Sequence, residues 1–380
     1  MKLVSSSSSS SAAAVLALLW ISAMAPVAVV CQNIKVRLSN QPATYWGVPP
    51  YIAQQEGYFS ALGLDVEFVT YPSGAPQVND ALNWDMGATG TSPAIIGASL
   101  DIYTIGISND ESAANALVGS NNAPWPLASI DAIPFYVSPS STGQFAVEAC
   151  MTQAGFSPAN AAYVGSSQTE IISSLEDSEE AAYGGLWAPN TYQLLENTPD
   201  SVQLCSAKDA GATVPGAIIV NKAFAESSPD VVAKVLSAWL RGINFINDPD
   251  NRDAAISYQK EFYATFQVSI SDVALENEID TRQLFGLDDQ IRVMEDEAGF
   301  WFTSIATFLE ENDQLASVPA FNTYIKSRYL FLVQNDETLS AYANGEDVDP
   351  NSSAGTRFTS LNFISVSVVA SSLVAIMYVL

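Results

Sequence analysis

Short segments of strand-forming residues alternate with helical segments through the first two thirds of the chain. Residues 34–38 and 64–71 have the composition of strands, and a helical segment that begins with proline lies between them at residues 49–59. A second series begins at residues 135–137 and continues to residues 217–220. This alternation constrains the fold most, because it predicts two α/β lobes, each with a mostly parallel sheet flanked by helices.

The pattern changes after residue 229, where apolar residues recur at helical spacing. Val235 and Trp239 share one helical face, and Met294, Trp301 and Ile305 share another. The chain has 380 residues, which is enough for two lobes with sizeable cores. We therefore expect a helical C-terminal region packed on the α/β part.

Charge and composition exclude several classes of function. The chain has 14 lysines and arginines against 41 aspartates and glutamates, a net charge of −27, so a nucleic-acid partner is not expected. It has no histidine, which excludes Ser-His-Asp triads, Cys-His dyads and His-ligated metals. Three cysteines are too few for a Cys-only zinc site, and no cofactor is expected.

The N-terminal segment has the order of a secretory signal. Lys2 is followed by an apolar run at residues 12–19, and a cleavage after Cys31 would give a signal peptide of residues 1–31. The alternative is a bacterial lipoprotein with Cys31 as the lipidated residue. In both cases the folded part faces the outside of the cell.

The C-terminal segment has the order of a GPI-attachment signal. Small residues precede a short polar spacer and an uncharged tail at residues 361–380. We expect attachment at Ser353, removal of residues 354–380, and an acidic stalk over residues 335–353. The alternative is a single C-terminal membrane anchor, because about 20 apolar residues can span a bilayer.

Two expected helix starts carry small polar residues next to glycine. One contains Gly90, Thr91 and Ser92, and the other contains Ser141 and Thr142. The free N–H groups and partial positive charge of a helix N-terminus bind anions. The alternative for each is an ordinary helix cap.

Four further residues are candidates for ligand contacts. Tyr45 and Trp46 lie on an expected loop between a strand and a helix, where α/β sheets bind ligands. Trp187 follows an expected strand and is either a core residue or a wall of the site. Glu111 could hold a ligand ammonium group, although an exposed acid is more often plain solvated surface.

The order of several short motifs resembles the substrate-binding proteins of nitrate, sulfonate and taurine ABC importers, with the taurine-binding proteins most similar. The motifs lie in residues 47–118 and 181–330. They include Gln-Gln-Glu-Gly-Tyr-Phe at 54–59, Gly-Thr-Ser-Pro at 90–93, Leu-Trp-Ala-Pro at 186–189 and Asn-Lys-Ala-Phe at 221–224.

The resemblance implies a two-lobe periplasmic-binding-protein fold of type II with the ligand between the lobes. Residues 32–117 and 215–334 would form lobe 1, and residues 118–214 lobe 2. The ligand would be a small organic sulfonate such as taurine, or a related anion or zwitterion, captured for uptake by a membrane transporter or receptor. The family's ligand positions match Tyr45, Trp46, Gly90, Thr91, Ser92, Ser141, Thr142 and Trp187.

The sequence departs from the taurine-binding pattern at two acidic positions. Asn115 and Gly216 stand where that pattern has acids, so a ligand ammonium would need another carboxylate, and Glu111 is the nearest. The fold family also includes thiamine-pyrimidine synthases that use a histidine, which this chain lacks. We therefore expect a binding protein and not an enzyme.

Two other functions stay open at this point. One is a cell-surface hydrolase with a carboxylate pair, which needs the two groups about 5–10 Å apart across a cleft. The other is a surface or adhesion protein that keeps the fold without a ligand. Independently of function, signal removal leaves only Cys150 and Cys205, and an oxidising compartment predicts a disulfide between them.

Overall fold

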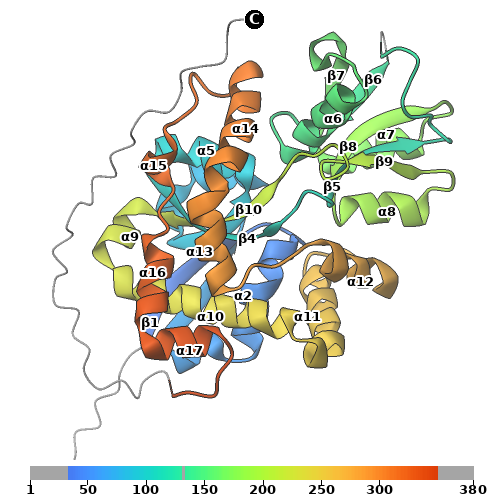
Figure 1. Cartoon of the computed structure of the whole chain (residues 1–380). Helices are drawn as coiled ribbons and strands as arrows, with labels where there is room; N and C mark the ends of the chain where they lie inside the picture. Colours follow the sequence, from blue (N-terminus) through green and yellow to red (C-terminus); the bar gives the residue numbers. More distant parts are fainter. Residues whose placement is uncertain (1–32, 131–132, 350–380) are drawn as a thin grey trace, which may run out of the picture.

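The computed structural model describes residues 33–130 and 133–349, and it contains two lobes with one sheet each (Figure 1). The predicted two-lobed α/β fold is confirmed by these sheets. The expected signal peptide, the GPI-attachment segment and Ser353 lie outside the described residues. Within the described ranges, no helix combines the length and the apolar composition needed to cross a membrane.

The sheet of lobe 1 has the strand order β2-β1-β3-β10-β4. Strands β1, β2 and β3 are parallel, and β10 runs antiparallel to both of its neighbours. Strand β3 is buried along its whole length, as expected for a central strand with helices on both faces. The bounds are β1 Ile34–Asn40, β2 Leu64–Thr70, β3 Met86–Gly90, β4 Ile102–Asp110 and β10 Pro215–Asn221.

The sheet of lobe 2 has the order β7-β6-β8-β5-β9, with β5 antiparallel to both neighbours. Cys150 in helix α6 and Cys205 in β9 form a disulfide, with their Cα atoms 6.1 Å apart, so that prediction is confirmed. The bounds are β5 Asn115–Ser120, β6 Pro134–Val137, β7 Ala162–Gly165, β8 Ala182–Trp187 and β9 Val202–Ser206.

Helices cover both sheets. The longest is α10, whose apolar side is buried in the core of lobe 1 and includes Val235, Trp239 and Ile243. The helices are α2 Val48–Gln55, α3 Tyr58–Ala61, α4 Gly74–Asn79, α5 Thr91–Gly97, α6 Thr142–Gln153, α7 Gln168–Glu176, α8 Asn190–Asn197, α9 Lys222–Ser227, α10 Pro229–Asn247, α11 Arg252–Ala264, α12 Asp272–Thr281, α13 Leu287–Asp296, α14 Ala298–Glu311, α15 Phe321–Tyr324, α16 Arg328–Asn335 and α17 Glu337–Ala343. Short 3₁₀ helices are η2 Tyr45–Gly47, η3 Ala81–Asn83, η4 Ala98–Leu100, η5 Pro158–Asn160 and η6 Pro249–Asn251.

The chain crosses between the lobes twice, at residues 111–114 and 207–214. The two crossings are joined by a backbone hydrogen bond in which the Glu111 N–H donates to Val214 O at 2.7 Å. The Ala207 N–H donates to Asn115 O at 2.9 Å beside it. These bonds hold the two crossings together as a paired connection at the base of the interlobe region.

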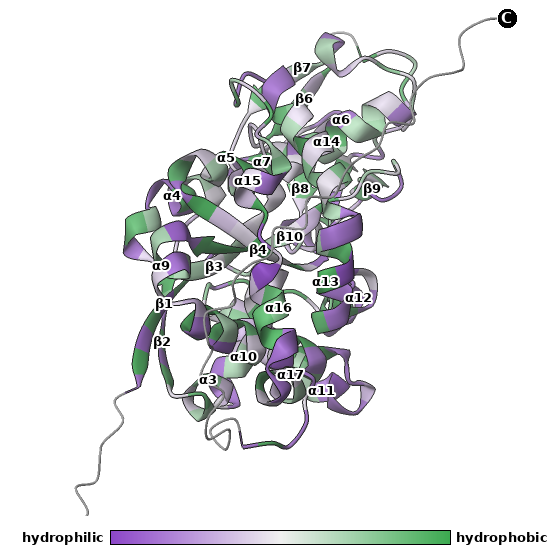
Figure 2. Cartoon of the chain, turned by 60° about the vertical axis from the view of Figure 1, so that its left-hand side comes forward, coloured by the Kyte–Doolittle hydropathy of each residue, from purple (hydrophilic) through white to green (hydrophobic). Residues whose placement is uncertain are grey.

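The segment expected to be an acidic stalk is folded over most of its described length. Residues 337–343 form α17, and Leu339 and Tyr342 are buried in lobe 1. The Asp336 carboxylate caps this helix by accepting from the N–H groups of Thr338 and Leu339. Figure 2 shows that α16 and α17 carry both apolar and polar residues. The stalk expectation was wrong for residues 337–343, because Asp336 and Glu337 cap and begin a helix whose apolar residues pack on lobe 1.

Candidate functional site

The loop after β1 carries two buried aromatic residues. Tyr45 and Trp46 form the 3₁₀ helix η2 and are buried, with 0% and 7% of their surfaces exposed. In the described part of the chain, neither the Tyr45 hydroxyl nor the Trp46 Nε1 has a hydrogen-bond partner. Burial raises the pKa of the Tyr45 hydroxyl well above its usual range, so this group stays a donor at ordinary pH.

Helix α5 begins with the predicted Gly90-Thr91-Ser92 motif. Gly90 is its N-cap, and Thr91 and Ser92 are fully buried. The Thr91 hydroxyl donates to Pro215 O on β10, so it holds the helix start on the sheet. The Ser92 Oγ has no partner among the described residues. Ser92, and not Thr91, therefore has a hydroxyl free for a ligand.

Helix α6 of lobe 2 begins at the other predicted motif. The Ser141 Oγ accepts from the Gln144 N–H and donates to Ser138 O at 2.7 Å, so this side chain serves as a helix cap. Thr142 is the first residue of the helix. The structure thus supports the cap alternative for the Ser141 hydroxyl and leaves Thr142 at the helix start.

Gly90 and Gly143 bring the candidate residues of the two lobes together. A Cβ atom on Gly90 would lie 3.9 Å from Cη2 of Trp46 and 4.0 Å from Cγ2 of Thr142. A Cβ atom on Gly143 would lie 3.2 Å from Cε3 of Trp187. Trp46, Gly90, Thr142 and Trp187 therefore lie close together where the two lobes meet, in the region that we call the cleft.

Contacts on both sides of the cleft hold the lobes against each other. On one side, the ring centres of Phe145 in α6 and Phe308 in α14 are 5.4 Å apart. Beside them, Gln144 Nε2 donates to Asn312 Oδ1 at 3.0 Å. On the other side, the Glu196 carboxylate of α8 accepts from the Ser271 hydroxyl at 2.6 Å, next to α12. The structure therefore shows the lobes in contact across the cleft.

Glu111 has a partner other than the expected ligand ammonium. Its side chain is 2% exposed, and its carboxylate forms an ion pair with Arg282. The guanidinium of Arg282 also forms an ion pair with Glu278 at 2.8 Å. Arg282 and Glu278 were not among the residues predicted from the sequence, because their four-residue spacing is typical of an exposed helical pair.

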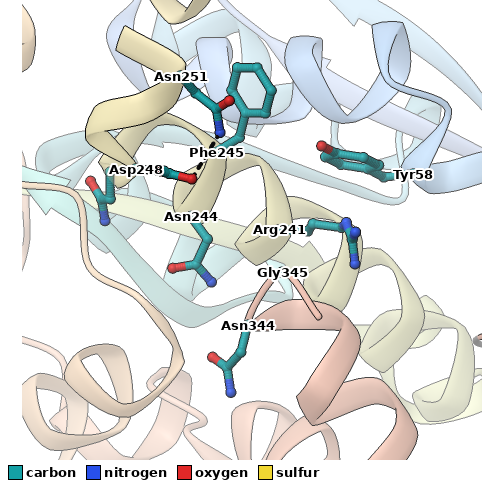
Figure 3. Close-up of a pocket in the computed structure, with 9 residues that line it drawn as sticks. Tyr58, Arg241, Asn244, Phe245, Asp248, Asn251, Asn344 and Gly345 are labelled. Carbon is teal, nitrogen blue, oxygen red and sulfur yellow. Dashed lines mark hydrogen bonds between the residues drawn. The ribbon is translucent and has the colours of Figure 1, made fainter. Parts of the chain in front are cut away.

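A separate pocket of about 350 Å³ lies on lobe 1 between α3, the end of α10 and the turn after α17 (Figure 3). Its amide groups serve the fold: Asn244 Nδ2 donates to Ala343 O, and Asn251 Nδ2 donates to Asp248. Arg241 packs against the rings of Tyr58 and Tyr342, at 4.9 and 4.5 Å. None of the residues predicted to bind the ligand lines this pocket.

Comparisons with solved structures agree with this architecture. The periplasmic aliphatic sulphonate-binding protein of Escherichia coli matches with a TM-score of 0.63 and 13% identity, over 77% of this chain and 91% of that one. The periplasmic nitrate-binding protein of Synechocystis PCC 6803 matches with a TM-score of 0.59 and 12% identity, over 83% and 92%. A Candida albicans protein with the generic periplasmic binding protein fold matches with a TM-score of 0.56 and 17% identity, over 78% and 96%.

Sequence comparison identifies the family. Among curated proteins, no sequence relative was found. The model of the NMT1/THI5-like family matches residues 47–252, which include Trp187, both crossings between the lobes and the starts of α5 and α6. This match spans more than half of the chain. The protein is therefore a member of the NMT1/THI5-like family, with the two-lobed fold of periplasmic binding proteins.

Proposed function

We propose that the protein is an extracellular solute-binding protein that captures a small sulfonate-type anion between its lobes. One observation carries the proposal. Three buried side-chain groups on η2 and at the start of α5, the two elements that supply Trp46 and Gly90 to the cleft, lack partners within the described residues. They are the Tyr45 hydroxyl, the Trp46 indole N–H and the Ser92 hydroxyl. All three can donate hydrogen bonds, and an anion can accept all three. A buried donor without a partner is costly, so a ligand that pairs with it gains affinity.

The remaining predicted residues have different proposed roles in the cleft. Gly90 and Thr142 would bring the two helix starts close to the anion, and Trp187 would bound the lobe-2 side. Thr91 and Ser141 would act by fixing their helix starts, because their hydroxyls bind the protein itself. Taurine is the first ligand to test, followed by other alkyl sulfonates and nitrate.

A zwitterionic ligand such as taurine also needs an acceptor for its ammonium group. Glu111 could serve only by sharing its carboxylate with Arg282, which already binds it. The Oδ1 atom of Asn115 is buried without a partner in the described structure, and Asn115 pairs with Trp187 across β5 and β8. Asn115 is therefore a second candidate for the ammonium end.

Two of the similar solved proteins are named as periplasmic binding proteins, one for aliphatic sulphonates and one for nitrate, which supports a binding role over catalysis. The buried carboxylates Glu111 and Glu278 both bind the same guanidinium, so neither is placed as a free acid or base. This arrangement does not favour a carboxylate-pair hydrolase built on them. We expect a membrane transporter or receptor to take the ligand from the closed protein.

A melting experiment followed by a product assay tests this function. Taurine, ethanesulfonate and nitrate are each added to the protein, the melting temperature is measured, and the same mixture is analysed for new products. A rise in melting temperature with an unchanged ligand is expected. A chemically altered ligand would indicate an enzyme, and an unchanged melting temperature with every anion would favour a surface protein without a ligand.

The proposed location is the cell surface, with GPI attachment at Ser353. The support is the order of small residues, polar spacer and apolar tail in the sequence. Phosphatidylinositol-specific phospholipase should release the protein from intact cells. A protein that stays bound, with a C-terminal peptide ending at Leu380, would contradict GPI attachment and support a membrane anchor.

A further inference from the structure

Three charged side chains form a buried cluster next to the Tyr45 ring. The exposed fractions of the Arg282, Glu111 and Glu278 side chains are 1%, 2% and 0%. One nitrogen of the guanidinium binds Glu111 and another binds Glu278. Two carboxylates therefore share one positive charge. We call these three residues the triad.

The triad carries one excess negative charge when both carboxylates are ionised. An uncompensated buried charge is costly, and a proton on one carboxylate removes it. Burial raises the pKa of Glu278 to about 7, although Arg282 and Tyr263 favour the ionised form. The polar and charged groups that interact with Glu278 come from five different elements or loops. They are Arg282, Glu111, Tyr263, Gln259, Tyr45 and Tyr192.

The surroundings of Glu278 can accommodate the proton. Tyr263 donates its hydroxyl to Glu278 Oε2 at 2.6 Å, and Gln259 Nε2 donates to the same oxygen. The other end of that amide, Gln259 Oε1, is buried and has no partner among the described residues. Half a turn of the amide would bring Oε1 to the carboxyl group, where it could accept the hydrogen bond of a protonated Glu278.

The triad is connected to the cleft through Tyr45. The guanidinium carbon of Arg282 lies 4.8 Å from the centre of the Tyr45 ring, which is the geometry of a cation–π contact. Both carboxylates hold this guanidinium, which packs against the ring of Tyr45, the neighbour of Trp46 in η2. Glu111 also joins the two crossings through its backbone N–H. The triad therefore contacts the Tyr45 ring on one side, and its Glu111 is part of the connection between the lobes.

We infer that Arg282 is a positioning residue for Tyr45 and that an anion entering the cleft is bound together with one proton, which Glu278 takes up from water. This inference rests on the proposed function, because it requires an anion at Tyr45. The physical reason is repulsion: the anion and the ionised triad carry the same sign, and protonation of Glu278 neutralises the triad. For two charges about 10 Å apart at an effective dielectric constant of about 20, the effect on affinity is on the order of tenfold.

The first test needs no ligand. Infrared spectra of the wild-type protein and of Glu278→Gln are recorded between about pH 5 and pH 9, and the carboxylic acid band is compared. Since the chain has no histidine, few other side chains titrate near pH 7. One carboxyl group with a midpoint near 7 is expected in the wild type and absent in the variant. A wild type without such a carboxyl overturns the inference whether or not an anion binds.

The second test measures proton uptake on binding. Ethanesulfonate is titrated into the wild type above pH 7 in two buffers with different ionisation enthalpies, and affinity is measured at about pH 6 and pH 8. Net proton uptake and an affinity about tenfold weaker at the higher pH are expected, and Glu278→Gln should show neither. Binding independent of pH overturns the inference and leaves the proposed function standing. A titrating Glu278 with no heat from any anion overturns both.

The positioning role is tested with Arg282→Lys and Arg282→Met. Lysine keeps the charge and should retain part of the affinity and the pH dependence, whereas methionine should lose both. The matched control is Arg292→Met, which removes an exposed, paired arginine on α13 and should change neither. Equal affinity in Arg282→Met and wild type, with both proteins folded by circular dichroism, would overturn the positioning role. If Arg282→Met does not fold, Arg282→Lys alone tests the role. An affinity and a pH profile unchanged from the wild type in Arg282→Lys would then overturn the positioning role.

Discussion

Gly90 in lobe 1 faces Thr142 in lobe 2, and a Cβ atom on the glycine would lie 4.0 Å from the threonine methyl. This contact joins the N-cap of α5 to the first residue of α6. Gly90 and Thr142, which are 52 residues apart in the sequence, thus bring the two helix starts together between the lobes. Their meeting depends on how closely the lobes approach each other.

A larger side chain at Gly90 should therefore block the cleft without unfolding the protein. Gly90 has extended backbone angles that other residues adopt, with φ −66° and ψ 162°. A Cβ there makes only ordinary contacts, but the rest of a leucine would enter the space between Trp46 and Thr142. Gly90→Leu should lose ligand affinity, keep its melting temperature, and have a larger radius of gyration by X-ray scattering. Gly299→Leu, on α14, is the control and should retain the ligand affinity of the wild type. If Gly90→Leu has the radius of gyration and the ligand affinity of the wild type, the proposed cleft is wrong.

The disulfide should contribute strongly to the stability of lobe 2. Cys150 and Cys205 are 55 residues apart, and closing a loop of that length stabilises a fold by roughly 3–5 kcal/mol in the loop-entropy model. The double variant Cys150→Ala, Cys205→Ala should lose a free energy of unfolding in this range, measured with denaturant. A loss below about 1 kcal/mol, or two free thiols found in the untreated wild type by mass, would contradict the expected contribution.

Glu278 should make stability depend on pH in a defined direction. Its pKa is raised in the folded protein, so the folded state holds a proton that the unfolded state releases. The contribution is fully present below about pH 4.5 and is lost as the pH rises through about 7. Between these values it should decline by roughly 1.4 kcal/mol per pH unit. The free energy of unfolding of wild type minus that of Glu278→Gln isolates this slope, and a difference that stays flat or rises with pH contradicts the assignment.

The sequence predicted the fold, and it singled out helix starts that meet between the lobes, because both depend on local patterns. Strand–helix alternation sets the two sheets, and glycine followed by small polar residues marks helix starts such as Gly90-Thr91-Ser92. The roles of the hydroxyls were less predictable. Thr91 and Ser92 are neighbours with similar chemistry, yet one binds Pro215 and the other has no partner in the described structure. That difference depends on a strand 124 residues away.

Arg282 could not be predicted because its partners are brought together only by folding. Glu111 lies 171 residues before it, and Tyr45 precedes it by still more of the chain. In the sequence, Glu278 and Arg282 have the spacing of a solvated helical pair. Helix α17 was not predicted for a related reason. The sequence shows the acidic residues at its start, but it does not show the surface of lobe 1 that buries Tyr342.

Salt should strengthen the binding of an anion to this protein. The chain carries a net charge of −27, which repels any anion at long range. Raising the ionic strength from about 10 mM to 150 mM shortens the screening length from about 30 Å to about 8 Å. Affinity for ethanesulfonate should rise over this range, whereas taurine, which has no net charge, should change less. Weaker ethanesulfonate binding at the higher salt would indicate a site dominated by exposed cations.

The buried donors without partners should bind an anion, and calorimetry with Ser92→Ala measures the contribution of one of them. The matched control is Ser99→Ala, an exposed serine beyond the same helix whose hydroxyl donates to Ile96 O. Hydrogen bonds to charged groups contribute about 1.5–3 kcal/mol, so Ser92→Ala should weaken taurine or ethanesulfonate binding by roughly tenfold or more. Ser99→Ala should bind as the wild type does. No heat from any sulfonate, or equal affinities for Ser92→Ala and wild type, would contradict the account.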